Sequence, residues 1–265
     1  MPPLAWQWRR RISVSPKSTV PLDLPAELWR SDPGFESWDG IVAAYKRAGR
    51  DASDERIHFD ATQTLLLDVV DAAGGVEHAV MRLRGAVSSA DVAKDRWLEG
   101  HPQPLPGDFG WSGPDTEEAW YALEDALVWA RTLDDRLKRP AASRETYQDQ
   151  GLIPALADGP RRNAVIAARS RLLQSEFGEA RHLAGLNLHM QSTQAFKAGV
   201  IRSGRVVLRF PDRVTVRISH RWELTYDDGR DAVAFADDLL GAVGGFMDEM
   251  ITALETHVPD RFERR

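Results

Sequence analysis

The sequence predicts a mainly α protein, a helical bundle with a small antiparallel β hairpin or meander inserted before the C-terminal helix. Two observations predict this fold. Apolar residues recur every three or four positions over most of residues 35–191 and again over 231–257, as on one face of a helix. Between about 198 and 226 the pattern changes to a period of two, which is typical of half-buried strands.

The composition narrows the class of protein. The chain has 265 residues, 43% hydrophobic and 28% charged, which is an ordinary globular composition. Because cysteine is absent, disulfides, thiolate nucleophiles and Cys-ligated metal centres are excluded. Apolar runs fall well short of the roughly 20 residues that span a bilayer, and the N-terminus has no apolar secretion core. We expect a soluble, cytoplasmic protein with no membrane partner.

Residues 1–34 are predicted to form an extended arm. They contain six of the fifteen prolines, which block helix interiors. They also contain Trp6, Trp8 and Trp29, and these large side chains have apolar area to bury. We expect the tryptophans to anchor the arm to a surface.

Helices are expected over residues 35–100. Phe35 to Tyr45 and then Glu55 to Val70 keep a helical spacing. Gly74-Gly75 is expected to end the second helix. Two shorter helices should follow, over about 76–83 and 90–98.

A loop and three helices are expected next. Residues 100–114 contain four prolines and four glycines and are predicted to be a loop. Helices are predicted over 117–139, capped by Asp115 or Thr116 and stopped by Pro140, over about 161–174, and over about 179–191 after Gly178.

The β segment and the last helix complete the chain. Residues 199–210 are predicted to be a hairpin that turns at Ser203-Gly204. Apolar residues at even positions predict one strand over 214–226, bent near a buried His220, with a turn at 227–229. The predicted divisions are an arm (1–34), a helical segment (35–100) and a bundle (115–265), and the last two parts could also form one continuous domain.

The charge is distributed unevenly. Residues 161–221 hold 12 basic side chains, 11 of them arginine, and three acidic ones, although the whole chain has a net charge of −6. Two interpretations remain open. The basic stretch could pair with the acidic stretches inside one fold, or it could present a positive surface to a polyanion such as RNA.

Most chemical motifs in the chain have structural explanations. Asp108-Phe109-Gly110 copies a kinase triplet, but the other kinase motifs are absent. Asp134 and Asp135 point about 100° apart on a helix, so we expect them to be solvated or salt-bridged. His182 and His189 are separated by about 10 Å along a helix, too far to share one metal ion. We therefore predict no metal and no cofactor.

One segment carries a more specific pattern. Arg181-His182, followed by Asn187 and His189, lies on a predicted helix inside the basic stretch, after the long helix 117–139. Over about 115–195 this arrangement resembles the HEPN superfamily, whose motif is an Arg, often followed by a polar residue, and then a His. The resemblance implies an all-helical bundle, commonly a homodimer, and in many members a metal-independent endoribonuclease.

The resemblance assigns roles to four residues. His189 would act as general acid or base, Arg181 would stabilise the transition-state charge, and Asn187 or His182 would orient groups. Seven residues separate Arg181 from His189, one more than is usual, which places them about 12 Å apart along a straight helix.

Two functional hypotheses follow, and we favour the first. One is a binding or oligomerisation module of unknown pathway. The other is a HEPN-type ribonuclease, toxin-like or defence-related, that binds RNA through residues 161–221. An enzyme acting on a small molecule is a distant third, because no constellation specific to such a reaction is visible.

Overall fold

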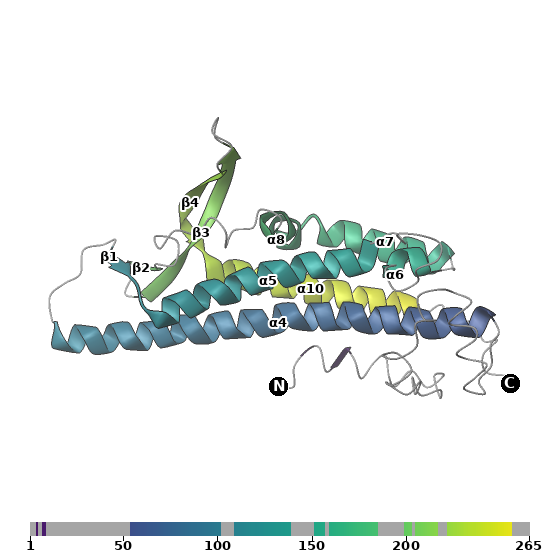
Figure 1. Cartoon of the computed structure of the whole chain (residues 1–265), viewed down its shortest axis with the longest axis horizontal. Coiled ribbons are helices and arrows are strands. Elements are labelled where there is room, and N and C mark those ends of the chain that lie inside the picture. The colour runs from purple at the N-terminus through teal and green to yellow at the C-terminus, as the bar shows by residue number, and fades with distance from the viewer. Residues whose placement is uncertain are drawn as a thin grey trace, which may run out of the picture. The chain divides into compact units, whose positions relative to one another are not determined.

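Helices dominate the structure, which is a computed structural model that describes residues 4, 7, 8, 54–101, 109–138, 151–156, 159–184, 199–202, 205–216 and 222–255. The prediction of a mainly α fold is confirmed (Figure 1). The described helices are α4 (Asp54–Gly100), α5 (Pro114–Lys138), α6 (Leu152–Ala155), α7 (Gly159–Leu172), α8 (Glu176–Ala184) and α10 (Ala232–Glu255).

In the described part of the chain, four strands form one antiparallel sheet in the order β1-β2-β3-β4. They are β1 (Phe109–Trp111), β2 (Gly199–Arg202), β3 (Arg205–Val216) and β4 (Trp222–Asp231). The predicted hairpin is confirmed, because Arg202 pairs with Arg205 on either side of residues 203–204. The predicted loop 100–114 is corrected at its end, where β1 pairs with β2.

The chain forms two compact units, each built from separate stretches. Unit 1 comprises residues 1–74, 132–171 and 244–265, and unit 2 comprises 75–131 and 172–243. Large apolar side chains fill both interiors; examples in unit 1 are Leu65, Val69, Leu133, Leu137, Leu152, Val165, Phe246 and Met250, and in unit 2 Val76, Leu83, Trp120, Leu123, Leu127, Phe177, Leu208 and Leu239.

Helix α4 corrects the prediction that Gly74-Gly75 ends a helix. It runs without a break for 47 residues through both glycines and through the two shorter helices expected after them. Packing explains why position 75 is a glycine, because a Cβ atom there would overlap the indole ring of Trp129 on α5. A glycine in a helix costs about 1 kcal/mol relative to alanine, so burial along the rest of α4 outweighs it.

Helix α5 begins slightly earlier than predicted. Pro114 occupies its first position, where the missing N–H costs no hydrogen bond. Thr116, instead of capping the helix itself, reaches back to Gly113: its Oγ1 accepts from the Gly113 N–H at 2.9 Å and donates to the Gly113 carbonyl at 2.7 Å. Gly113 is therefore the residue that directly precedes the helix, and Thr116 holds its backbone in place.

The single strand predicted over 214–226 is wrong. Strands β3 and β4 are two antiparallel strands, in which Val214 pairs with Leu224 and Val216 with Trp222. The chain therefore reverses between residues 216 and 222. The turn predicted at 227–229 is also wrong, since β4 continues to Asp231 with an irregular register, in which Phe210 pairs with Asp227 but the adjacent Arg209 pairs with Asp231.

Polar side chains join the sheet of unit 2 to its helices. The Asp91 carboxylate of α4 accepts a hydrogen bond from the backbone N–H of Val206 on β3 at 2.7 Å. At the end of β4, the Asp231 carboxylate accepts from the Val233 N–H at 2.8 Å and so caps α10. Arg84 of α4 then pairs with Asp237 of α10 at 2.8 Å.

Several predictions fall on the remainder of the chain. Trp8 is buried, as expected for an anchoring side chain. Leu4, Gln7 and Trp8 are helical, so the extended conformation predicted for the arm is wrong at these three positions. The other residues of the arm, the helix expected over 35–45 and the interior His220 lie outside the described residues. Among the helices that are described, none is long and apolar enough to cross a membrane.

Candidate functional site

Helix α8 carries the first half of the Arg–His motif, and local contacts define its start. The Ser175 hydroxyl accepts from the Phe177 N–H at 3.3 Å and donates to the Leu172 carbonyl at 2.7 Å. Gly178, predicted to precede the helix, lies inside it. A Cβ atom at this position would overlap the Leu173 carbonyl oxygen. The close turn between α7 and α8 therefore requires glycine at position 178.

The structure places two of the four predicted catalytic residues. Phe177, Ala180 and Leu183 form the buried face of α8, while Arg181 is half-buried and His182 is exposed. Both basic residues lie in the last turn of α8, where the helix dipole favours positive charge. The described helix ends at Ala184, and Asn187 and His189 lie outside the described residues.

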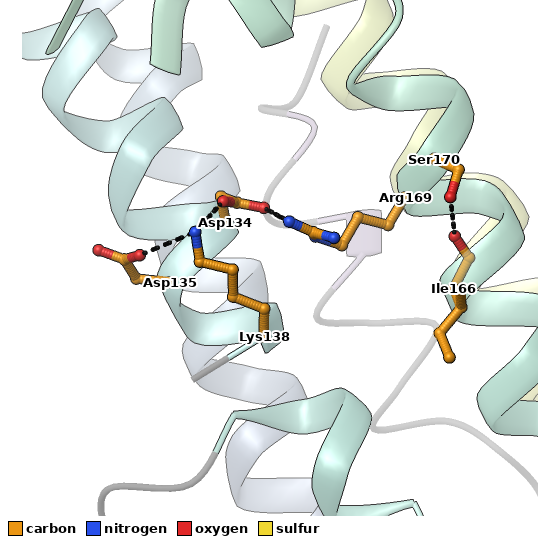
Figure 2. Close-up of polar contacts among 6 residues, drawn as sticks. All are labelled: Asp134, Asp135, Lys138, Ile166, Arg169 and Ser170. Atoms are coloured by element: carbon orange, nitrogen blue, oxygen red, sulfur yellow. Dashed lines mark hydrogen bonds and ion pairs between the residues drawn. The ribbon is translucent and has the colours of Figure 1, made fainter. Parts of the chain in front are cut away.

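The strongest buried polar constellation lies in unit 1, around Asp134 of α5. This residue is fully buried (0% exposed). Its Oδ1 accepts from Nε of Arg169 on α7 at 2.7 Å, and Nη2 of the same side chain lies 2.6 Å away. Its Oδ2 accepts from Nζ of Lys138 at 2.7 Å (Figure 2). Both carboxylate oxygens are therefore bound to cations, as a carboxylate removed from water requires.

The Asp134–Asp135 pair divides into two different environments. Asp135 points away from Asp134 and lies 3.7 Å from the same Lys138 ammonium, at the exposed edge of α5 (Figure 2). The prediction that these neighbours are solvated or salt-bridged is confirmed. Because Asp134 has both oxygens engaged, its geometry suits cross-linking of two helices better than proton transfer.

In the described part of the basic stretch, Arg169 and Arg171 form ion pairs within the chain. Besides Arg169, Arg171 at the end of α7 contacts Glu249 of α10 at 2.6 Å. Both acidic partners lie outside residues 161–221. For these two side chains, the interpretation that the basic stretch pairs within the fold is therefore confirmed.

A buried lysine forms a second polar constellation, in unit 2. Lys94 is only 3% exposed, and its Nζ lies 3.4 Å from Asp91 and 3.2 Å from Asp95. Since Asp91 also accepts from the Val206 N–H, the same carboxylate neutralises the lysine and ties strand β3 to α4. This constellation is missed by sequence reasoning, because Asp91 and Val206 are 115 residues apart.

Aromatic rings lie at the end of α4, close to these polar groups in sequence. Trp97 and His101 are stacked, with ring centroids 4.4 Å apart and an interplanar angle of 9°. Trp111 of β1 meets Trp97 edge-on at 6.2 Å and packs against Ala90 and Val206. The aromatic contacts therefore fasten β1 to the helix.

Among the described residues, burial and neighbouring charges shift the pKa values of Asp68 and Arg82. Partial burial raises the pKa of Asp68 above its usual 3.8, although Arg136, 3.6 Å away, lowers it and Asp71 raises it further. The pKa of Arg82 is raised by hydrogen bonds to Glu118 and Asp125, at 2.5 and 2.6 Å. Neither group has the neighbours of a general acid or base.

Helix α5 also exposes apolar side chains. Seven large apolar side chains are exposed in the described part of the chain, and three of them, Tyr121, Val128 and Trp129, lie within nine residues of α5. The opposite side of the helix is buried through Ala119, Leu123, Ala126 and Leu127. An apolar cluster on the outer side of an otherwise well-packed helix is a feature of interaction surfaces.

The described residues show no metal centre, and comparison with known proteins identifies no relative. No three His, Asp or Glu side chains converge as metal ligands in the described ranges. No protein family, no curated protein and no solved structure matches the chain.

Proposed function

We propose that the protein is a binding and oligomerisation module with a HEPN-like helical scaffold. The single observation that carries this proposal is the cluster of Tyr121, Val128 and Trp129 on α5, which are 43%, 51% and 40% exposed. Exposed clusters of tyrosine and tryptophan are typical of protein interfaces.

The polar constellations support a scaffold rather than a reaction centre. Asp134 and Lys94 are buried, and each is neutralised by opposite charges of the chain itself. Such buried pairs hold elements in register, and leave no oxygen or amine poised toward a substrate. Arg169 and Arg171 are likewise engaged with carboxylates, which reduces the positive charge that RNA would meet.

A nuclease assay tests the proposal against its rival. The purified chain is incubated with labelled single-stranded RNA in EDTA, beside the His189→Ala variant and a matched His182→Ala variant. The module predicts no cleavage by any of the three proteins. Cleavage by the wild type that disappears in His189→Ala would contradict the module and would favour a metal-independent ribonuclease.

We also propose that the protein acts in the cytoplasm.

A further inference from the structure

We propose that one face of helix α5 docks against the same face of a second copy of this chain, with the two helices antiparallel. This face, the α5 face, consists of Glu117, Tyr121, Val128 and Arg131, all of which are exposed. The inference rests on the proposed function, because it names the partner of the binding module.

The four residues share one side of the helix. At 100° per residue they fall within an arc of about 80°. Tyr121 and Val128, the two apolar residues, lie in the middle, about 10 Å apart along the axis. Glu117 and Arg131 lie at the two ends, about 21 Å apart. Glu124 also falls within this arc, between Tyr121 and Val128, and is partly buried. The face therefore has two apolar side chains on either side of Glu124, with one acidic and one basic end.

This order of charges selects the orientation of the partner. In an antiparallel pair related by a two-fold axis near position 124, Glu117 of each copy faces Arg131 of the other, and Tyr121 faces Val128. A parallel pair would instead bring Glu117 near Glu117 and Arg131 near Arg131, which is repulsive. The α5 face is thus complementary to itself when reversed, as a two-fold interface requires.

The acidic side chains nearest the axis already have partners within their own chain. Asp125 is held by Arg82 at 2.6 Å. Glu124 accepts a hydrogen bond from the Trp120 indole N–H at 3.2 Å. These contacts lessen the repulsion between the two copies. Trp129, packed over Gly75, extends the apolar area along one flank.

Sedimentation equilibrium of the full chain over a range of concentrations tests the interface. We expect a reversible monomer–dimer equilibrium in the wild type, because a pair of single helices is a small contact. Val128→Glu should raise the dissociation constant by more than about tenfold. Val92→Glu is the matched control, since Val92 on α4 is 49% exposed, close to the 51% of Val128, and lies outside the α5 face. Circular dichroism checks that both variants keep their helices.

Charge exchange tests the orientation. Glu117→Arg and Arg131→Glu should each weaken the dimer, whereas the double variant should restore it, because the opposite charges then face each other again. A chain that is monomeric at every concentration, a dimer equally sensitive to Val92→Glu, or a double variant without recovery would overturn the interface. Each of these results differs from RNA cleavage lost in His189→Ala, which would overturn the proposed function.

Discussion

Replacing Asp134 with alanine is expected to destabilise the fold by about 3 kcal/mol. Removing one partner of a buried ion pair costs about 3–5 kcal/mol, because the other charge stays buried without compensation. Because only 20% of the Arg169 side chain is exposed, its unpaired charge would account for most of this loss of stability. Lys138 is 37% exposed and can turn toward water, so its share is that of a surface pair, about 0–1 kcal/mol. The estimate therefore lies at the lower end of the range for buried pairs.

The measurement is urea unfolding followed by far-ultraviolet circular dichroism, with thermal unfolding alongside. For a chain of this size, a loss of about 3 kcal/mol corresponds to a fall in Tm of roughly 6–12 °C. Asp135→Ala is the matched control, since Asp135 is the adjacent aspartate, contacts the same lysine and is 51% exposed. That variant should change the free energy of unfolding by less than about 0.5 kcal/mol.

A second variant separates the loss of charge pairing from the loss of packing. In Asp134→Leu combined with Arg169→Met, no unpaired buried arginine remains, so the double variant should recover most of the stability lost in Asp134→Ala. Equal free energies of unfolding for Asp134→Ala and Asp135→Ala would refute the reasoning. A double variant as unstable as Asp134→Ala would show that packing, not the stranded charge, determines the cost.

The remaining predictions concern helix glycines and pH. Gly85→Ala should raise the free energy of unfolding by up to about 1 kcal/mol, because nothing lies within 4 Å of the added Cβ. Gly75→Ala should gain less or become destabilising, because the Cβ displaces Trp129, and the fluorescence maximum of Trp129 should shift; an equal gain at both sites would contradict this. Since the folded-state pKa of Asp68 is raised, the folded state binds more protons and stability falls as pH rises above 3.8. Asp68→Asn should therefore stabilise the fold at pH 7 but not below pH 3.8, and a pH-independent effect would argue against burial as the cause.

Helix periodicity was sufficient to predict most of the helical segments. The predictions over 117–139, 161–174 and 231–257 agree with α5, α7 and α10 to within a few residues. In each of these helices one side is buried and the other exposed, so the spacing of apolar residues follows directly from the fold. The prediction that the Arg–His motif lies on a helix is confirmed for its first two residues, Arg181 and His182.

The period-two pattern could not reveal where the chain reverses. Val216 and Trp222 are paired across the hairpin and both occupy even positions. Apolar residues therefore stay at even positions in both strands, so the sequence pattern does not distinguish two strands from one. Only the backbone pairing distinguishes them.

The sequence by itself determined the mainly α class, the β hairpin at 203–204 and the bounds of α5, α7 and α10 to within a few residues, because these depend on contacts between near neighbours and on which side of an element is buried. The tertiary structure decided the rest. Gly75 became an interior helical residue because Trp129, 54 positions away, packs against it. Asp134 is a buried link between α5 and α7 because Arg169, 35 positions away in sequence, donates a hydrogen bond to its carboxylate. Such contacts leave no local pattern, since the partner of each residue is chosen by the packing of whole helices.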